Sequence, residues 1–280
     1  MDHHDHGLAH DLVTLGRLAS ERRVMLRWLA GLGTVSLLGC GGGGDDTGST
    51  TTTTTTTGST GTTTTTTSSC SVIPEETAGP YPGDGSNNNG LSALALSGVV
   101  RSDIRSSFAG ATGVAEGVLL TVKLTLVNTA SSCADLSGYA IYLWHCDRAG
   151  RYSMYSSGVT AENYLRGVQA TDTDGVATFT TIFPACYSGR MPHIHFEIYR
   201  STTTATSYTN KLKTSQMAFP VDVCSTVYAT TGYEASVANL AAISFSTDNV
   251  FSDGVTSQIA TLSGSVSNGY VAELTVGISV

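Results

Sequence analysis

Two histidines stand one residue apart in the stretch HIHFEIY, residues 193–199. Successive side chains of a β-strand point to opposite faces, so His193 and His195 share one face with Glu197. The roots of the two imidazoles are then roughly 6.5–7 Å apart, which allows both rings to bind one metal ion. An amphipathic strand with its polar face in water produces the same pattern. The motif by itself therefore leaves a metal site and a solvated strand both open.

The residues around this motif predict strands rather than helices. In VLLTVKLTLV, residues 118–127, apolar side chains alternate with threonine and lysine. YAIYLWHCD, residues 139–147, is rich in strand-forming residues, and DGVATFTTIF, residues 174–183, begins with an Asp-Gly turn signal. We expect an all-β fold, a β-sandwich, with at most short helices near residues 236–243.

Composition narrows the class of protein. The chain has 280 residues and a formal net charge of −8, and only 13% of its residues are charged. An acidic chain of this kind does not suit a nucleic-acid partner held by phosphate neutralisation. Residues 41–69 are almost entirely Gly, Thr, Ser and Asp, which predicts a disordered tether. Residues 70–280 are then left as one domain; the sequence does not indicate its oligomeric state.

Residues 1–40 are predicted to be an export signal. Arg22 and Arg23 precede an apolar run at residues 28–38, which is long enough for a signal-peptide core and short for a membrane span. Twin arginines after a polar leader resemble a Tat signal. The ending LLGC resembles a lipobox, in which Cys40 is acylated after cleavage. We expect a lipid-anchored protein of the cell envelope, or an extracellular one, attached to a membrane only through that lipid; an ordinary Sec signal is the alternative.

Several longer motifs surround the histidine pair: WHCDRAGRYS, RGVQATDTDG and TIFPACYSGRMPHIH lie within residues 144–195, and PEETAGPYP spans residues 74–82. In these motifs the chain resembles the intradiol ring-cleavage dioxygenases, the non-haem iron family that includes protocatechuate and catechol dioxygenases. The resemblance covers residues 70–235 and implies the β-sandwich core of that family. Its implied substrates are a catechol-type aromatic diol and O2.

The resemblance implies four ligands of a non-haem ferric ion: Tyr152, Tyr187, His193 and His195. The chemistry of these side chains agrees, because anionic phenolate oxygens stabilise ferric over ferrous iron and a bound cation can keep a tyrosine deprotonated at neutral pH. A zinc site more often contains cysteine or a third histidine. An iron(II) site would combine the two histidines with a carboxylate such as Glu197, which leaves the tyrosines unexplained.

The resemblance also implies three catalytic side chains. Tyr187 leaves the iron when substrate binds and takes a substrate proton, and Arg190 stabilises negative charge that develops on the ring. Gln216 lies near the iron, although a longer Thr-rich hairpin precedes it here. The implied reaction inserts both atoms of O2 and cleaves between the hydroxyl-bearing carbons, giving a cis,cis-muconate-type diacid. For Arg190 a surface salt bridge is the alternative.

Other residues near the motifs have plainer interpretations. Tyr81 either lines the way into the site or packs in a turn, and His145 and Trp144 are predicted to be supporting residues. Asp172 and Asp174 are expected to form a turn. Five cysteines follow Cys40, so at least one is unpaired. Cys186 has no predicted role. A thiol beside ferric iron would be open to oxidation, so its position next to Tyr187 is unexpected.

A second class of function stays open at this point. A non-catalytic β-sandwich module for adhesion or glycan binding would also have alternating strands, with the histidines on a polar face. The intact set of four candidate ligands argues against this class, because a decayed relative would be expected to have lost at least one of them.

Overall fold

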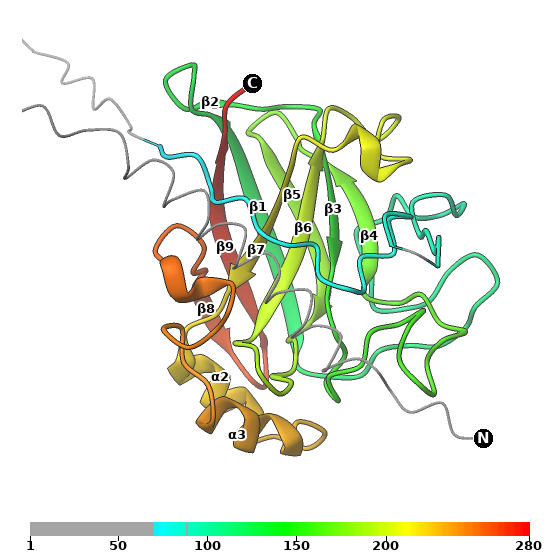
Figure 1. Ribbon diagram of the computed structural model, residues 1–280, viewed down its shortest axis with the longest axis vertical. Helices are drawn as coiled ribbons and strands as arrows, with labels where there is room; N and C mark the ends of the chain where they lie inside the picture. Colours follow the sequence, from blue (N-terminus) through cyan, green and yellow to red (C-terminus); the bar gives the residue numbers. More distant parts are fainter. Residues whose placement is uncertain (1–69, 88) are drawn as a thin grey trace, which may run out of the picture. The chain divides into compact units, whose positions relative to one another are not determined.

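The computed structural model describes residues 70–87 and 89–280 (Figure 1). The predicted export signal, residues 1–40, and the predicted tether, residues 41–69, lie outside the described residues. None of the described helices is long and apolar enough to cross a membrane.

Nine strands form two sheets within the described part of the chain, which confirms the predicted all-β fold. The first sheet has the order β2-β1-β9-β8, with β5 also paired to β1. Its strands are β1 (Leu119–Asn128), β2 (Ala134–Asp135), β5 (Val176–Ile182), β8 (Thr261–Ser265) and β9 (Gly269–Ile278). β1 and β9 are parallel, and the other pairs in this sheet are antiparallel.

The second sheet is antiparallel throughout and has the order β4-β3-β6-β7. Its strands are β3 (Ala140–Trp144), β4 (Arg166–Ala170), β6 (His193–Tyr199) and β7 (Lys213–Ala218). Two short helices follow β7, α2 (Val221–Tyr228) and α3 (Glu234–Ala241); single 3-10 turns lie between β6 and β7, η1 (Tyr208–Asn210), and after α3, η2 (Phe251–Asp253). The helix predicted near residues 236–243 is α3, whereas α2 was not predicted.

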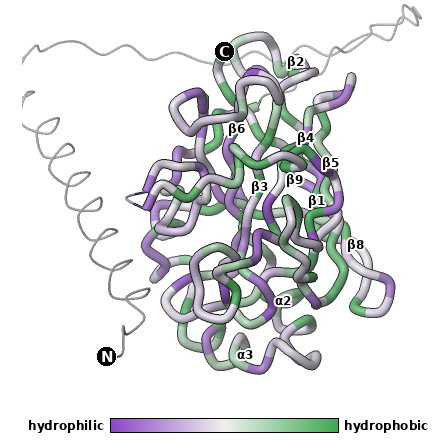
Figure 2. The backbone as a smooth tube through the Cα atoms, turned by 90° about the vertical axis from the view of Figure 1, so that its right-hand side faces the viewer, coloured by the Kyte–Doolittle hydropathy of each residue, from purple (hydrophilic) through white to green (hydrophobic). Residues whose placement is uncertain are grey.

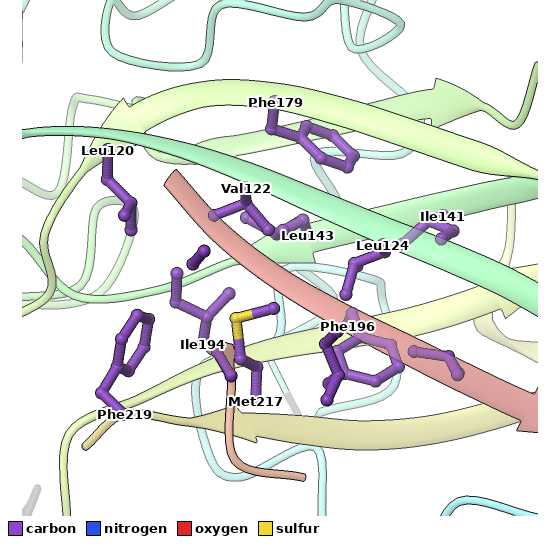
Figure 3. Packing of buried hydrophobic residues seen from close by; sticks show 14 of the residues in the cluster. Leu120, Val122, Leu124, Ile141, Leu143, Phe179, Ile194, Phe196, Met217 and Phe219 are labelled. Carbon is purple, nitrogen blue, oxygen red and sulfur yellow. The ribbon is translucent and has the colours of Figure 1, made fainter. Parts of the chain in front are cut away.

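The hydrophobic core lies between the two sheets (Figure 3). Alternate residues of β1 are fully buried and face β3 and β6: Leu120, Val122, Leu124 and Leu126. Their partners on the second sheet include Ile141, Leu143, Ile194 and Phe196. The hydrophobic, green segments in Figure 2 include β1, in agreement with this alternation. Period-two patterning therefore predicted which side chains enter the core.

The second sheet is buried on its other face too. The N-terminal segment crosses in front of β7 and β6 (Figure 1), and Glu76 N–H donates to the Thr214 carbonyl at 2.9 Å. As a result all seven residues of β6 are buried. The alternative that the polar face of β6 lies in water is therefore wrong.

One disulfide fixes the start of this covering segment. Cys70 is bonded to Cys133 beside β2, and the described domain also contains three free, buried cysteines, Cys146, Cys186 and Cys224. This agrees with the expectation that at least one thiol is unpaired. The disulfide connects the first described residue to the turn after β1, so the segment over β6 is held at its beginning.

Candidate metal centre

The histidine pair lies where β6 begins. Alternation along the strand directs His193 and His195 away from the sandwich, while Ile194 and Phe196 enter the core. Each imidazole is at most 2% exposed. The strand thus presents both rings to the same buried region under the N-terminal segment.

Four side chains converge around Nε2 of His193. Nε2 of His195 is 3.1 Å away, the Tyr187 hydroxyl 3.2 Å and the Tyr152 hydroxyl 3.5 Å. These are the four residues that the sequence motifs single out. Two nitrogen and two oxygen donors therefore meet at one point, although their positions span more than forty residues of the chain.

Local structure delivers each tyrosine. Tyr152 follows the turn after β3, where the Asp147 carboxylate accepts hydrogen bonds from the N–H groups of Ala149 and Arg151. Tyr152 N–H donates to Ser156 Oγ at 2.9 Å. Tyr187 belongs to the loop between β5 and β6. The Tyr152 loop is thus held by its own side chains before any ligand binds.

The two imidazoles are oriented with Nε2 toward this point. Nδ1 of His193 is 2.7 Å from the Met191 carbonyl, which can only accept, so Nδ1 carries the proton and Nε2 has a free lone pair. The His195 ring stacks on Trp144 at 4.9 Å with an angle of 3°. The backbone of Gly79 approaches the edge of this ring: a Cβ added at Gly79 would lie 3.4 Å from Cε1 of His195. Gly79 also has a φ of +67°, which favours glycine. Trp144 and Gly79 therefore confine the ring, as predicted for Trp144.

Burial sets the protonation states of this cluster. Burial lowers the pKa of His193 and of His195 well below the usual value, and the charge of Arg190 adds to the effect. Burial raises the pKa of Tyr152 well above 10, and nearby Tyr187 contributes. The imidazoles are neutral, as metal ligation requires, and Tyr152 stays protonated unless a cation lies beside it.

This donor set fits ferric iron. Neutral imidazole nitrogens and phenol oxygens that need a cation to ionise suit a small, highly charged ion. Among the described residues no group of three or more His, Cys, Asp or Glu side chains could hold a metal. Glu197 in particular accepts hydrogen bonds from Tyr199 at 2.7 Å and Lys211 at 2.9 Å, so it does not complete an iron(II) triad.

Arg190 is the charged group of the cluster. Its Nη1 is 3.5 Å from Nε2 of His193, and its Nη2 donates to Oε1 of Gln216 at 2.6 Å. Gln216 in turn donates to the Thr77 carbonyl at 2.9 Å. Arg190 is 6% exposed, so it is not part of a surface salt bridge. The structure thus brings both Arg190 and Gln216 to the four predicted ligands.

The sequence matches the family described as Dioxygenase over residues 103–258, more than half of the chain. The chain belongs to the intradiol ring-cleavage dioxygenases. An intradiol ring-cleavage dioxygenase from Tetranychus urticae has a similar structure, with a TM-score of 0.57 and 25% identity over 75% of this chain and 95% of that one. None of the curated proteins matches this chain.

Two further structures are more distant. The dioxygenase domain of a dioxygenase carbohydrate-binding protein fusion from Streptomyces sp. SirexAA-E has a TM-score of 0.47 and 21% identity, over 75% of this chain and 99% of that one. The 3-chlorocatechol 1,2-dioxygenase from Rhodococcus opacus 1CP has a TM-score of 0.45 and 18% identity, over 73% and 72%.

The other residues noted in this dioxygenase have supporting places. His145 bonds the Cys146 carbonyl at 2.8 Å and the Thr181 hydroxyl at 2.7 Å, and burial lowers its pKa to about 4. Tyr81 is half-buried and packs against Tyr152 with ring centroids 5.1 Å apart. Asp172 accepts hydrogen bonds from the N–H groups of Asp174 and Val176, which confirms a turn there.

Cys186 faces the sandwich core and not the cluster, although Tyr187 is its neighbour. Its thiol donates to the Arg190 carbonyl at 3.4 Å, and burial raises its pKa to about 12. A buried thiol that stays protonated is a poor nucleophile and resists oxidation. Cys186 is therefore a packing residue of this dioxygenase, and its thiol does not face the candidate ligands.

Sequence reasoning missed two residues that hold the site. Asp248 is fully buried and accepts hydrogen bonds from Arg190 Nε at 3.0 and 3.3 Å. Arg166 is 1% exposed and donates to the carbonyl of Ser153, the residue after Tyr152. Asp248 stands in the polar stretch STDNVF, where one aspartate has no distinguishing signal. Arg166 could have been noticed, because it begins the motif RGVQATDTDG.

Arg166 ties the Tyr152 loop to the N-terminal segment. Its guanidinium donates to the carbonyls of Tyr81 at 3.0 Å, Pro82 at 2.7 Å and Ser153 at 3.0 Å, and its Nε donates to the Ser153 hydroxyl at 3.1 Å. It also donates to the Tyr142 hydroxyl at 3.3 Å. One side chain therefore satisfies acceptors of three separate segments beside the candidate ligand.

Replacing Arg166 by Met is expected to destabilise the domain by about 3 kcal/mol, because buried acceptors lose their donor. Urea unfolding of the metal-free protein measures this change, with Arg200→Met at an exposed position as the control. A loss below about 1 kcal/mol would show that water replaces the guanidinium and that Arg166 is not the tie between these segments.

The lowered histidine pKa values make the metal-free protein acid-sensitive. Since the folded pKa lies below the ordinary 6.5, the unfolded chain binds protons that the folded protein does not. This contribution is complete above pH 6.5 and is lost as the pH falls below it; His145 acts in the same direction. Glu197 acts oppositely, because burial raises its pKa to about 7. Because three histidines outweigh one glutamate, we expect a lower free energy of unfolding at pH 5.5 than at pH 7. Urea titrations at the two pH values measure this difference. Equal free energies would contradict buried, neutral imidazoles.

Proposed function

We propose that this chain is a non-haem ferric dioxygenase that acts on a catechol-type aromatic diol. It inserts both atoms of O2 and cleaves the ring between the two hydroxyl-bearing carbons, giving a cis,cis-muconate-type diacid. The observation that carries the proposal is the convergence of two tyrosine oxygens and two neutral imidazole nitrogens on one buried point.

In this proposal four side chains hold the iron: Tyr152, Tyr187, His193 and His195. A bound ferric ion would supply the positive charge that ionises the phenols, and chelation of that ion by the two diol oxygens would prepare the ring for reaction with O2. Burial raises the pKa of Tyr152 well above its usual value, so its hydroxyl would ionise only beside such a cation.

The two tyrosines differ in how closely their side chains are packed. Tyr152 is 2% exposed and packed between the rings of Tyr81 and Tyr187, whereas Tyr187 is half-buried. Tyr152 therefore keeps its place. Tyr187 is the side chain that gives way to substrate, and its oxygen takes a hydroxyl proton from the diol as a positioned base.

Arg190 is placed to stabilise negative charge on the ring. Nη1 faces the same point as the four ligands, while Nη2 is held by Gln216. A fixed donor in a site without water stabilises developing charge more than a mobile one, because it need not reorganise during the reaction. Gln216 acts by orienting the guanidinium, and the Thr77 carbonyl orients Gln216.

The experiment loads the full chain with ferric iron and records its visible spectrum before and after catechol is added under air. A red-brown charge-transfer band that shifts with catechol, oxygen uptake and a muconate-type product are expected. Extradiol products, or a colourless protein that binds no iron, would overturn the proposal. The second outcome would favour the non-catalytic binding module instead.

We also propose that the protein is exported through its twin-arginine signal and held by a lipid on Cys40. The disulfide between Cys70 and Cys133 supports an oxidising compartment. Labelling with a fatty-acid analogue and fractionation test this: Cys40→Ser should release the protein from the membrane fraction. Unchanged labelling of that variant would remove Cys40 as the anchor.

A further inference from the structure

The Arg190 guanidinium divides its donors among three directions. Nε donates to Asp248, Nη2 donates to Gln216, and Nη1 points toward His193. A guanidinium is planar and rigid, so two fixed donors determine where the third one lies. The position of Nη1 at the site therefore depends on Asp248 as much as on Gln216.

Asp248 is built into the back of the site. Besides Arg190, its carboxylate accepts hydrogen bonds from the N–H groups of Met191 at 2.6 Å, Val250 at 2.8 Å and Phe251 at 3.1 Å. All these contacts are buried. The carboxylate thus joins the residues just before β6 to the segment at η2.

The same segment contacts the site through Phe251. Its ring centroid is 6.5 Å from that of His193 and 5.8 Å from Cζ of Arg190. Asp248 holds the backbone from which this ring projects. One carboxylate therefore positions both the charged and the apolar side chain behind His193.

Asp248 also cancels a charge. Arg190 and Asp248 are 7% and 0% exposed in their side chains, and their ion pair measures 3.0 Å. A buried cation with its own carboxylate has less attraction left for a second anion. Arg166, the other buried arginine beside the site, uses its donors on protein carbonyls and hydroxyls.

We propose that Asp248 is a positioning residue that fixes the Arg190 guanidinium and, by cancelling its charge, makes the site prefer catechols without an anionic ring substituent. This inference rests on the proposed function for its substrate. The position of the guanidinium does not depend on that function, and it can be measured in the metal-free protein.

The first test follows the Arg190 Nε–H in the metal-free chain by ¹⁵N NMR, assigned by its disappearance in Arg190→Gln. A slowly exchanging signal is expected in the natural protein. In Asp248→Asn its exchange is expected to become ~10-fold faster or more, because the charged acceptor is lost. An unchanged signal would overturn the positioning role, whatever the protein catalyses.

The second test compares iron-loaded variants on 4-methylcatechol and 3,4-dihydroxybenzoate, which differ in the charge of one substituent. Asp248→Asn should lower kcat/KM for 4-methylcatechol about 10²-fold through misplacement of the guanidinium. It should raise the ratio of kcat/KM for the acid over the neutral diol ~10-fold, because the Arg190 charge is no longer cancelled. A lower activity with an unchanged ratio would overturn the charge role.

Two controls separate the possible failures. Asp253→Asn removes an equal charge from an exposed residue of the same segment and should change neither readout. Combined with Arg190→Gln, Asp248→Asn should no longer change the ratio, since the effect acts through Arg190.

If Asp248→Asn does not fold, Asp248→Glu replaces it. The ratio of the two kcat/KM values should then keep its natural value while the Nε–H signal shifts. A changed ratio would contradict the proposal. If the natural protein cleaves neither diol, the proposed function is refuted. The NMR result then still decides whether Asp248 positions the Arg190 guanidinium.

Discussion

Replacing Tyr152 by Phe should abolish tight ferric binding and the charge-transfer colour. The change removes one of two anionic oxygens from a site whose other two donors are neutral imidazoles. Loss of a supporting contact alone typically costs 10–100-fold in metal affinity, so loss of a ligand should cost more than about 100-fold. Iron content after dialysis against a competing chelator, together with the visible spectrum, measures the effect.

The same substitution should leave the metal-free fold almost unchanged. The Tyr152 hydroxyl lies 3.5 Å from Nε2 of His193, a weak contact, and burial raises its pKa, which favours the neutral phenol in the metal-free protein. We expect the free energy of unfolding to change by less than about 1 kcal/mol. Metal loss without unfolding would therefore identify a ligand and not a packing residue.

Tyr155→Phe is the matched control, because Tyr155 lies in the same loop. Its hydroxyl accepts hydrogen bonds from Gly83 N–H and the Asn87 amide, both at 2.9 Å, and not from the cluster. This variant should keep its iron and colour. Full iron and colour in Tyr152→Phe would contradict the ligand assignment.

The strands of the sandwich were predictable because their signal is local. Alternation in residues 118–127 specifies which face of β1 enters the core, and the burial of Leu120 and Leu124 follows it. α2 escaped prediction for a related reason. Its residues, VDVCSTVY, include three β-branched valines, so its helical character arises from packing of Cys224, Val227 and Tyr228 and not from local preference.

The candidate ligands were accessible from sequence for a different reason, namely that their motifs resemble a known family. The environment that decides their chemistry was not. Whether the polar face of β6 is buried depends on the segment containing Thr77 and Gly79, more than a hundred residues away in the chain. Asp248 reaches Arg190 from a loop beyond α3. Contacts between such remote, irregular segments have no period for a sequence pattern to reveal.

Replacing Arg190 by Gln should lower kcat by about 10²–10³-fold while iron stays bound. The buried guanidinium brings a positive charge to the four candidate ligands, with its Nη1 3.5 Å from Nε2 of His193. Stabilisation of charge that appears during the reaction affects kcat more than KM, because the free diol does not yet carry that charge.

Steady-state kinetics with 4-methylcatechol and the visible spectrum of the iron-loaded variant together decide the role of Arg190. A normal charge-transfer band with slow turnover is expected, since Arg190 is not proposed as a ligand. Arg200→Gln, on the exposed residue after β6, should retain full activity. If Arg190→Gln instead lost its iron, the guanidinium would be holding the ligand cluster together. If kcat were unchanged, the negative charge on the ring would have to be stabilised elsewhere, and the buried pair with Asp248 would be a structural ion pair alone.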